Sequence, residues 1–415
     1  MKFHREIVDI WDAQKRIEPW IRPLDTEKVK LIDSIGRYLG ENVSATHDFP
    51  HFRRSMMDGF AVRSTDTKGA SDERPVALKV IESIPCGAVP KKKLTANTAA
   101  RIMTGAMMPE GADSVVIIEL TEQMQKNGQT YTVLRKEATP NENVIPVGLE
   151  MTKGTMILEK GRKINPGEAA LLAAFGYDTV TVSRRPTVAI FATGSELLDV
   201  NEPLEPGKIR NSNTYMVVAQ VLNAGGLPVL LEKVPDNVGL AKEMILEAME
   251  KVDIVISTGG ASVGDYDILV NIFEQWDGKM LFNKVAMRPG SPTTVGIWRD
   301  KFLFALSGNP GACFVGFELF VRPVIWGMQG KPNYFLPSFS AFLAEDYKKM
   351  DSFYRIVRGT SEIIDGKIYV RPAGIDQSNI LSSIRNTDCL IIIPSDRKLM
   401  NKGEIVQVLK LNIPE

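Results

Sequence analysis

The most constraining feature of the chain is the alternation of apolar strand patterns with helical patterns between residues 186 and 330. The runs TVAIFA and DIVIS are apolar and β-branched, which is typical of strands buried on both faces. Between them, Ser212 is a suitable N-cap for a helix that Gly225 would end, and residues 240–251 carry an apolar stripe at helical spacing. Strands that alternate with helices predict a doubly wound α/β domain with a parallel sheet.

Three further regions differ from this α/β domain, which we place at residues 183–330. Residues 46–149 combine Thr, Val, Pro and Gly with short apolar runs, so they predict a β-rich domain inserted into its neighbour. That neighbour consists of residues 1–45 with 150–182 and is predicted to be mainly helical. Residues 331–415 return to short strands and predict a small β-barrel or sandwich, of which we favour the barrel. A chain of 415 residues is long enough for these four domains.

Composition limits the partners and the location of the protein. Lys plus Arg number 50 and Asp plus Glu also number 50, so the net charge gives no general attraction to nucleic acid or to acidic membranes. The most apolar stretch, FVGFELFVRPVIWGM, contains Glu318 and Arg322, and we therefore interpret it as a core helix. The cysteines lie far apart, and the N-terminus lacks the apolar core of a signal peptide. We expect a cytoplasmic protein without nucleic-acid or membrane partners.

A glycine-rich turn followed by two acids is the strongest candidate for a ligand site. It follows the strand DIVIS directly, and ligands of doubly wound sheets bind beyond the carboxyl ends of the strands. Backbone N–H groups of such a turn can approach a phosphate, and Asp265 and Asp267 beside a phosphate favour Mg²⁺. The alternative, a glycine turn with an aspartate cap, explains the order of strand, glycines and acids less well. The turn residues are Gly259, Gly260, Ser262 and Gly264.

Two other strand ends carry polar groups. After TVAIFA, Gly194 and Ser195 can contact a phosphate and Glu196 can bind a metal. A helix N-terminus with Glu in its first turn, where the helix dipole favours it, explains the same residues and is the better interpretation when they are taken alone. Asp236 ends a further predicted strand, and by itself it is only a helix cap.

Two cations, Lys284 and Arg288, precede a turn formed by Pro289 and Gly290. Residues four apart in an extended segment share a face, so the two side chains could hold an oxyanion or a phosphate. A solvated pair of charges is an equally good interpretation.

Four more polar residues lie in segments that composition alone explains structurally. Asp58 and Thr104 each precede a glycine in the β-rich region, and Arg358 and Ser378 lie in the C-terminal region. Turns and solvated faces are the default for such residues. The residues by themselves therefore indicate only a phosphorylated ligand bound with Mg²⁺ at the end of a parallel sheet.

Five motifs in one order add a family resemblance. They are SMMDGFAV, RIMTGAMMPEGADSVV, ATGSELL, STGGASVGDYD, and VAMRPGSPTT followed by LSGNPGA. Together they closely resemble the molybdopterin molybdenumtransferases, the family of bacterial MoeA and of the E domain of gephyrin. The likeness extends over nearly the whole chain.

The resemblance implies a homodimer of four-domain subunits whose active site is shared between the subunits. Molybdate would be inserted into the dithiolene of molybdopterin-AMP, with release of AMP and a requirement for Mg²⁺. A molybdopterin adenylyltransferase and molybdoenzyme-maturation proteins are the implied partners. Glu150 is the nearest match to a further acidic position of the family. The implied functional residues are Asp58, Thr104, Glu196, Asp236, Asp265, Lys284, Arg288, Arg358 and Ser378, with Glu196, Asp236 and either Asp265 or Asp267 as metal ligands.

Two departures from the family pattern affect the implied molybdate site. Many members have Lys where this chain has Arg288, and many have Lys where it has Ser291. Arginine keeps the charge and can bind an oxyanion through two nitrogens, whereas Ser291 would have to donate a hydrogen bond to the anion or the site would have to shift. The sequence leaves open whether the metal is molybdenum or tungsten.

Two other functions remain as alternatives. A nucleotide enzyme of the molybdopterin adenylyltransferase type would share the glycine turn, but the additional domains argue against it. A non-enzymatic scaffold of the gephyrin type would not need the acidic positions that this chain retains, such as Asp58 and Asp265.

Overall fold

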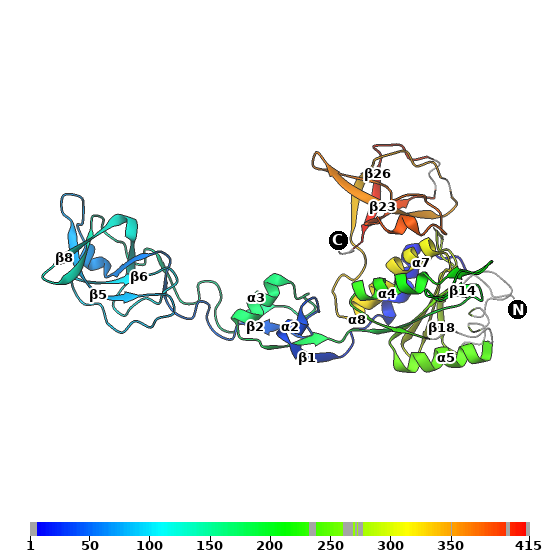
Figure 1. The fold of residues 1–415 in the computed structure, drawn as a ribbon, viewed down its shortest axis with the longest axis horizontal. Coiled ribbons are helices and arrows are strands. Elements are labelled where there is room, and N and C mark those ends of the chain that lie inside the picture. The colour runs from blue at the N-terminus through cyan, green and yellow to red at the C-terminus, as the bar shows by residue number, and fades with distance from the viewer. Residues whose placement is uncertain are drawn as a thin grey trace. The chain divides into compact units, whose positions relative to one another are not determined.

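The structure, a computed structural model, describes residues 6–231, 238–259, 269, 272, 277–349, 351–395 and 399–411 (Figure 1). Contacts divide the chain into two compact units, each of which we describe by itself. The large unit contains Met1–Glu41, Lys160–Ala169 and Asp178–Glu415, and the small unit contains Asn42–Glu159 and Ala170–Tyr177.

The small unit is built on one mixed, six-stranded sheet with the order β7-β4-β6-β5-β9-β8. Its β5 and β6 are parallel and its other neighbours are antiparallel. This is the β-rich fold that the alternation of Thr and Val with turn residues predicts. The strands of the sheet are β4 (Gly59–Val62), β5 (Val76–Ile84), β6 (Thr98–Ile102), β7 (Ser114–Ile117), β8 (Thr121–Lys126) and β9 (Gln129–Leu134). Outside the sheet, β2 (Val43–Ser44) pairs with β11 (Met156–Leu158), and β3 (Arg54–Ser55) with β10 (Val144–Ile145).

The N-terminal segment of the large unit is less helical than its sequence predicts. Helix α1 (Ile10–Ile17) has Asp9 as its N-cap, whose carboxylate accepts from Trp11 N at 2.9 Å. After a single 3-10 turn over Glu18–Trp20, however, the chain forms β1 (Thr26–Lys30), which pairs with β12 (Thr179–Ser183), and the short α2 (Leu31–Ser34) follows it. The helical pattern fails here because a β-strand partner far away in the sequence decides the conformation.

Helix α3 (Pro166–Ala174) begins as its sequence predicts. Asn165 precedes the proline, and Glu168 Oε2 accepts from the Asn165 backbone N–H at 3.0 Å. A glutamate that reaches back from the third helical position satisfies a backbone donor that the helix leaves free.

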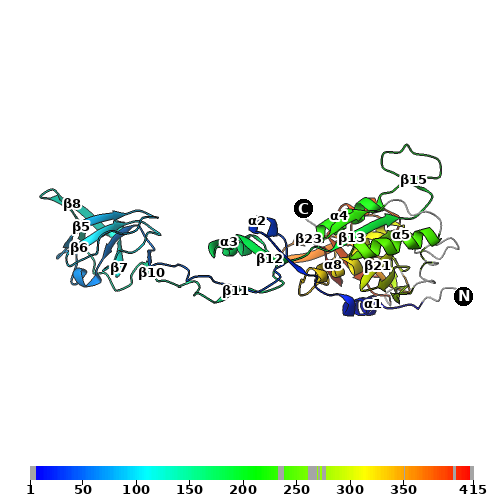
Figure 2. The same ribbon diagram turned by 90° about the horizontal axis from the view of Figure 1, so that it is seen from below.

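The α/β region is a doubly wound sheet of six strands in the order β16-β13-β17-β21-β20-β18. The first four strands are parallel, and β20 and β18 are antiparallel additions at one edge. Alternate residues of β13 face opposite sides: Val188 and Ile190 pack in the cluster that contains α4, while Ala189 and Phe191 pack in the cluster that contains α5 (Figure 2). The elements are β13 (Thr187–Ala192), α4 (Asn213–Asn223), β16 (Leu227–Leu230), α5 (Val238–Lys251), β17 (Ile254–Thr258), β18 (Lys279–Phe282), β20 (Thr294–Trp298) and β21 (Lys301–Leu306).

A continuous helical run over Pro310–Met328 fills the core beside this sheet. It consists of α7 (Pro310–Gly316), a π-helical turn over Phe317–Val321 and α8 (Arg322–Met328). Within the described residues it is the helix that is long and apolar enough to cross a membrane, yet all of it is buried inside the protein. The prediction of a core helix is therefore confirmed.

The C-terminal region is a closed five-stranded β-barrel, as predicted. It closes because β23 (Tyr354–Ile364) pairs with both β24 (Lys367–Pro372) and β25 (Cys389–Ile393). The remaining strands are β22 (Ser338–Leu343) and β26 (Ile405–Lys410). The short strand β19 (Met287–Arg288), which comes from the α/β region, adds to β23 in parallel.

Candidate functional site

Three neighbouring parallel strands end at the same level of the sheet. Ala192, Thr258 and Leu306 are the last residues of β13, β17 and β21 and lie in register. Thr193 N donates to Thr258 O at 3.3 Å, and Gly259 N donates to Leu306 O at 3.0 Å. The three turns that follow are thus held side by side at the carboxyl edge, where ligands of such sheets bind.

Gly259 is required by the close approach of two of these turns. Its φ of +102° lies in the region that favours glycine, and a Cβ at this position would lie 2.9 Å from both Thr193 O and Thr193 Oγ1. Beside it, Thr258 Oγ1 is buried and has no hydrogen-bond partner among the residues that the structure describes. The edge therefore holds a buried hydroxyl without a described partner at the carboxyl end of a parallel strand, where ligands of such sheets bind.

Gly194 and Glu196 form the turn after β13. Gly194 has φ +139°, and a Cβ there would lie 2.5 Å from a carboxylate oxygen of Glu196. The chain enters the short strand β14 (Leu197–Leu198) at once, so the alternative that Glu196 lies in the first turn of a helix is wrong. Ser195 and Glu196 are both exposed.

Arg358 and Ser378, which come from the barrel, lie against the start of α7. Ser378 contributes its backbone carbonyl, which accepts from Gly311 N at 2.9 Å. Arg358 is 2% exposed, and a Cβ on Gly311 would lie 2.5 Å from its Nη1. Because α7 follows β21 after a turn of three residues, this contact brings the barrel next to the third strand end.

The guanidinium of Arg358 is buried without a carboxylate in hydrogen-bond contact within the described chain. Its Nε donates to Ser383 Oγ at 3.0 Å and its Nη2 to Gln377 O at 2.8 Å. Nη1 has no partner in the described residues. Burial lowers the pKa of Arg358, while the charge of the nearby Asp376 acts in the opposite direction. Such a guanidinium can accept a ligand oxyanion as its counter-charge.

Arg288 and the Pro289–Gly290 turn lie between β19 and α7. Gly290 has φ +93°, and a Cβ there would lie 3.4 Å from Ala312 O. The Arg288 side chain is half-exposed, with Nε 3.7 Å from Asp351 Oδ2. Lys284 is partly buried, and its carbonyl accepts from Val8 N at 3.0 Å.

Ser291 does not offer its hydroxyl to an anion. It is 3% exposed, and its Oγ donates to Val285 O at 2.7 Å. The hydroxyl therefore holds the chain together below the turn, and any oxyanion site here depends on Arg288 rather than on Ser291.

Asp58 and Thr104 meet in the small unit. Asp58 precedes β4 and Thr104 follows β6, and these strands pair with Gly59 opposite Ile102. Asp58 Oδ1 accepts from Thr104 N at 2.7 Å and from Thr104 Oγ1 at 3.0 Å. These two hydrogen bonds lower the pKa of Asp58, so the carboxylate stays ionised. Glu150, in the same unit, forms an exposed ion pair with Arg54 at 3.4 Å.

Several predicted site residues lie outside the described residues, namely Asp236, Gly260, Ser262, Gly264, Asp265 and Asp267. Among the residues that are described, no group of three or more His, Cys, Asp or Glu side chains could hold a metal ion. Glu196 is the predicted metal ligand that the structure places.

Sequence reasoning missed two residues that join the elements at this edge. Asn213, the first residue of α4, donates from Nδ2 to Gly308 O at 2.8 Å, and its buried Oδ1 has no described partner. Gly311 leaves the space that Arg358 occupies. Asn213 follows the predicted N-cap Ser212 directly, which is the signal that could have identified it.

Comparisons with known proteins identify the family of the chain. The pattern of the MoeA N-terminal region (domain I and II) matches residues 8–176, that of a probable molybdopterin binding domain matches 189–326, and that of the MoeA C-terminal region (domain IV) matches 340–411. The molybdopterin molybdenumtransferase of Bacillus subtilis (strain 168) is 46% identical over 407 residues, which are 98% of this chain and 94% of the relative. The chain belongs to the molybdopterin molybdenumtransferase family.

Further relatives agree with this assignment. The molybdopterin molybdenumtransferase of Staphylococcus aureus (strain MSSA476) is 42% identical over 405 residues, covering 98% of this chain and 96% of the relative. The crystal structure of the molybdopterin biosynthesis MoeA protein from Pyrococcus horikoshii OT3 has a TM-score of 0.83 and 31% identity, covering 98% of this chain and all of the other. As a molybdopterin molybdenumtransferase, the chain is a transferase of molybdenum cofactor biosynthesis with molybdopterin and molybdenum as substrates.

Proposed function

We propose that this molybdopterin molybdenumtransferase acts in the cytoplasm on adenylylated molybdopterin, which a molybdopterin adenylyltransferase supplies, and that it releases AMP as molybdate enters the dithiolene. The observation that carries the proposal is the buried guanidinium of Arg358, whose Nη1 has no hydrogen-bond partner among the described residues, together with three aligned strand ends. Molybdate is a dianion and the pterin substrate carries phosphates. The buried guanidinium of Arg358 and the half-exposed guanidinium of Arg288 near this edge can serve both.

Each part of the edge has a task in this mechanism. The turns at Gly194 and Gly259 would lie beside the substrate phosphates, and their glycines let the chain fold closely here, since a Cβ would meet Glu196 at the first and Thr193 at the second. Arg358 and Arg288 attract molybdate and hold its oxygens near the dithiolene. The Asp58 carboxylate, kept ionised by Thr104, belongs to the small unit and would accept hydrogen bonds from substrate held at the strand ends of a second copy of the chain. These residues bind and orient the two substrates, and no side chain becomes a covalent nucleophile.

Magnesium belongs to the same proposal. The described residues fit it in one respect, since Glu196 is an exposed carboxylate at the sheet edge and Mg²⁺ prefers oxygen ligands. Asp236 and either Asp265 or Asp267 would complete the ligand set. When bound, the metal would polarise phosphoryl oxygens and offset the charge of the departing AMP.

The test is a reconstitution with purified protein, molybdopterin-AMP, Mg²⁺ and molybdate. We expect AMP release and the formation of active cofactor, both dependent on molybdate. Asp58→Asn should retain the fold and lose most of the turnover, whereas Glu110→Gln, an exposed carboxylate on the same unit, should have no effect. Turnover of ATP without molybdate would instead indicate an adenylyltransferase, and the absence of AMP release would refute the proposal.

We further propose that the enzyme is a homodimer in which Asp58 and Thr104 complete the partner's strand-end site. The support is an apolar surface on the large unit at the sheet edge formed by β16. Leu227 and Leu230 of this strand are 42% and 54% exposed, and the exposed Ile32 and Ile35 line a pocket together with Leu227. An edge strand with exposed apolar side chains is a surface that natural proteins cover.

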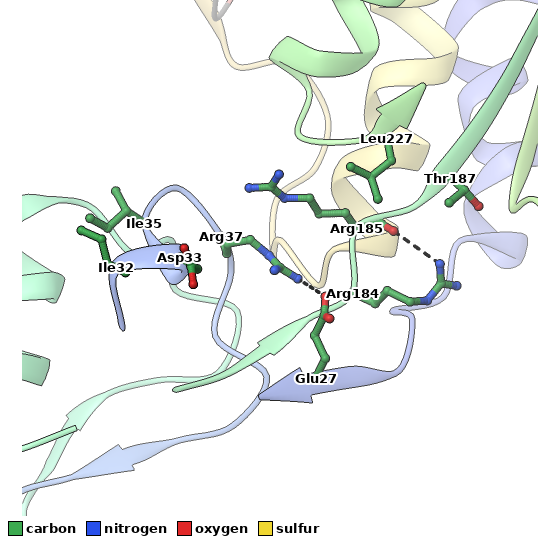
Figure 3. A pocket seen from close by; sticks show the side chains of 9 residues that line it. All are labelled: Glu27, Ile32, Asp33, Ile35, Arg37, Arg184, Arg185, Thr187 and Leu227. Atoms are coloured by element: carbon green, nitrogen blue, oxygen red, sulfur yellow. Dashed lines mark hydrogen bonds and ion pairs between the residues drawn. The ribbon is translucent and has the colours of Figure 1, made fainter. Parts of the chain in front are cut away.

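A pocket of about 700 Å³ in the large unit runs beside this surface. Arg37 pairs with Glu27, and Arg185 extends between the Ile32–Ile35 segment and Leu227 (Figure 3). Burial and the neighbouring Arg37 charge lower the pKa of Arg185. A second copy of the chain would cover the apolar wall and supply a carboxylate or carbonyl to Arg185.

The oligomeric state tests this proposal directly. The molar mass in solution, measured by light scattering during size exclusion, should be twice that of the chain. Leu230→Glu should give a folded monomer, whereas Ile363→Glu, an equally drastic change on the exposed barrel surface, should leave the dimer intact. A monomeric unmodified protein would contradict the proposal.

A further inference from the structure

Arg288 lies beside a second arginine in the strand pairing. Strands β19 and β23 are parallel with Arg288 opposite Arg355. Two guanidinium groups in adjacent positions repel each other unless a counter-charge lies between them. Asp351 provides it: its Oδ2 lies 3.3 Å from Arg355 Nη1 and 3.7 Å from Arg288 Nε.

Asp351 is itself held firmly. It is 17% exposed, and its Oδ1 accepts from Phe353 N at 3.3 Å. Arg355 is fixed from the other side, because Nη2 donates to Asp376 Oδ2 at 2.7 Å and Nε donates to Tyr347 Oη at 2.6 Å. The carboxylate that contacts Arg288 is therefore linked to the barrel through Arg355, which two short hydrogen bonds hold in place.

An aromatic ring completes the surroundings of Arg288. The guanidinium carbon lies 5.5 Å from the centre of the Phe353 ring, within the range of a cation–π contact. The carboxylate contacts the guanidinium through Nε only. Nη1 and Nη2 have no hydrogen bond or ion pair within the described part of the chain, so the two terminal nitrogens remain available to a ligand.

We propose that Asp351 and Phe353 are positioning residues that aim the terminal nitrogens of Arg288 at the molybdate oxyanion. The inference rests on the proposed function, which assigns molybdate to this edge. It also explains why arginine suits this chain: a lysine ammonium is a single point charge and cannot contact Asp351 with one nitrogen while it offers two others to an oxyanion.

The charges of the cluster remain favourable to an anion. Arg288, Arg355 and Lys349 are cations, and Asp351 and Asp376 are the carboxylates that contact them, so the cluster retains one positive charge. Asp351 therefore restricts the direction of Arg288 without cancelling the attraction for a dianion.

The sign of the effect of Asp351→Asn separates positioning from simple charge. The variant removes a negative charge, so a purely Coulombic role predicts tighter molybdate binding. Positioning predicts weaker binding, by roughly tenfold, because misaligned donors lose much of their value. Molybdate binding to the full-length protein would be measured by calorimetry, together with the KM for molybdate and kcat for AMP release.

Three further variants complete the experiment. Phe353→Leu should also raise the KM for molybdate while kcat changes little, and Glu362→Gln, which alters an exposed ion pair with Arg371 on the same barrel, should change neither. In an Arg288→Lys background, Asp351→Asn should no longer weaken binding. Thermal melting would confirm that each variant folds.

The outcomes distinguish this inference from the proposed function. Unchanged or tighter molybdate binding in Asp351→Asn, while Arg288→Ala weakens it, would overturn the positioning role alone. Unchanged binding in Arg288→Ala would remove Arg288 from the site and overturn the inference with it. Failure of AMP release in the unmodified enzyme would instead refute the proposed function.

Discussion

Two regions of the large unit bury an arginine almost completely, and they differ in whether a carboxylate contacts the guanidinium. Arg322, 1% exposed in the core helix, contacts the buried Glu318 one turn earlier, with Nη2 2.9 Å from Oε1. Arg358, 2% exposed where the barrel meets α7, donates only to a hydroxyl and a backbone carbonyl among the described residues. A buried charge with its counter-charge is part of the core, whereas one without it is costly and indicates a place for a ligand.

Replacing Arg322 should have the largest effect on stability. Arg322→Met leaves Glu318 buried and unpaired, which should lower the free energy of unfolding by about 3–5 kcal/mol. Chemical denaturation would measure this loss, and the double variant Arg322→Met with Glu318→Leu should recover most of it. Activity per folded molecule should remain near normal. A stable single variant would mean that the pair contributes little and that the comparison is wrong.

Replacing Arg358 should reverse this pattern. Arg358→Met breaks no ion pair, so the free energy of unfolding should change by about 1 kcal/mol or less. The KM for molybdate should rise roughly 10- to 100-fold, since a charge-assisted hydrogen bond contributes about 1.5–3 kcal/mol. Steady-state AMP release at varied molybdate concentration provides the measurement. Arg371→Met, an exposed arginine on β24, is the matched control. Severe destabilisation without an effect on molybdate would assign Arg358 to the core.

The fold was predictable where local pattern and tertiary context agree. Buried runs such as TVAIFA form central parallel strands, and Glu318 and Arg322 correctly marked a core helix rather than a membrane span. Prediction failed at Thr26–Lys30, where a strand replaced a helix. Nothing within those five residues identifies β12 as a partner, because that strand lies far along the chain.

The site was predictable from the strand ends but not from its long-range contacts. The glycines after β13 and β17 do meet at one edge, which follows from the parallel order of the strands. Contact of Arg358 with Gly311, or of Arg288 with Asp351, depends on how the barrel packs, and no periodicity records that. Ser291 shows the same limit: the sequence allows it to donate to an anion, yet it is buried and its hydroxyl donates to Val285 O.

A further expected effect, confined to alkaline pH, is a pH dependence of stability beside the Arg322 pair. The Lys331 ammonium lies 3.2 Å from the centre of the Trp326 ring, over which Arg322 is also placed. Burial first, and then the charges of Lys163 and Arg322, lower the pKa of Lys331 from 10.5 to about 8. Between these two pH values the unfolded chain binds the proton that the folded chain has lost. The free energy of unfolding should therefore rise as the pH increases through this interval.

Lys331→Met isolates that contribution from other groups that titrate at alkaline pH. The unfolding free energy of the unmodified protein minus that of Lys331→Met should increase from pH 8 to pH 10.5, the interval between the folded and unfolded pKa values of Lys331. Below and above this interval the difference should be constant. Denaturant titrations at several pH values would provide the curve. In Glu318→Gln, the pH at which this rise in stability begins should be more acidic. Arg322 would then act on Lys331 with its charge uncompensated and would lower the folded-state pKa of Lys331 further. If the rise began at the same pH in Glu318→Gln, Glu318 would not neutralise Arg322, and the contrast between the two buried arginines would disappear.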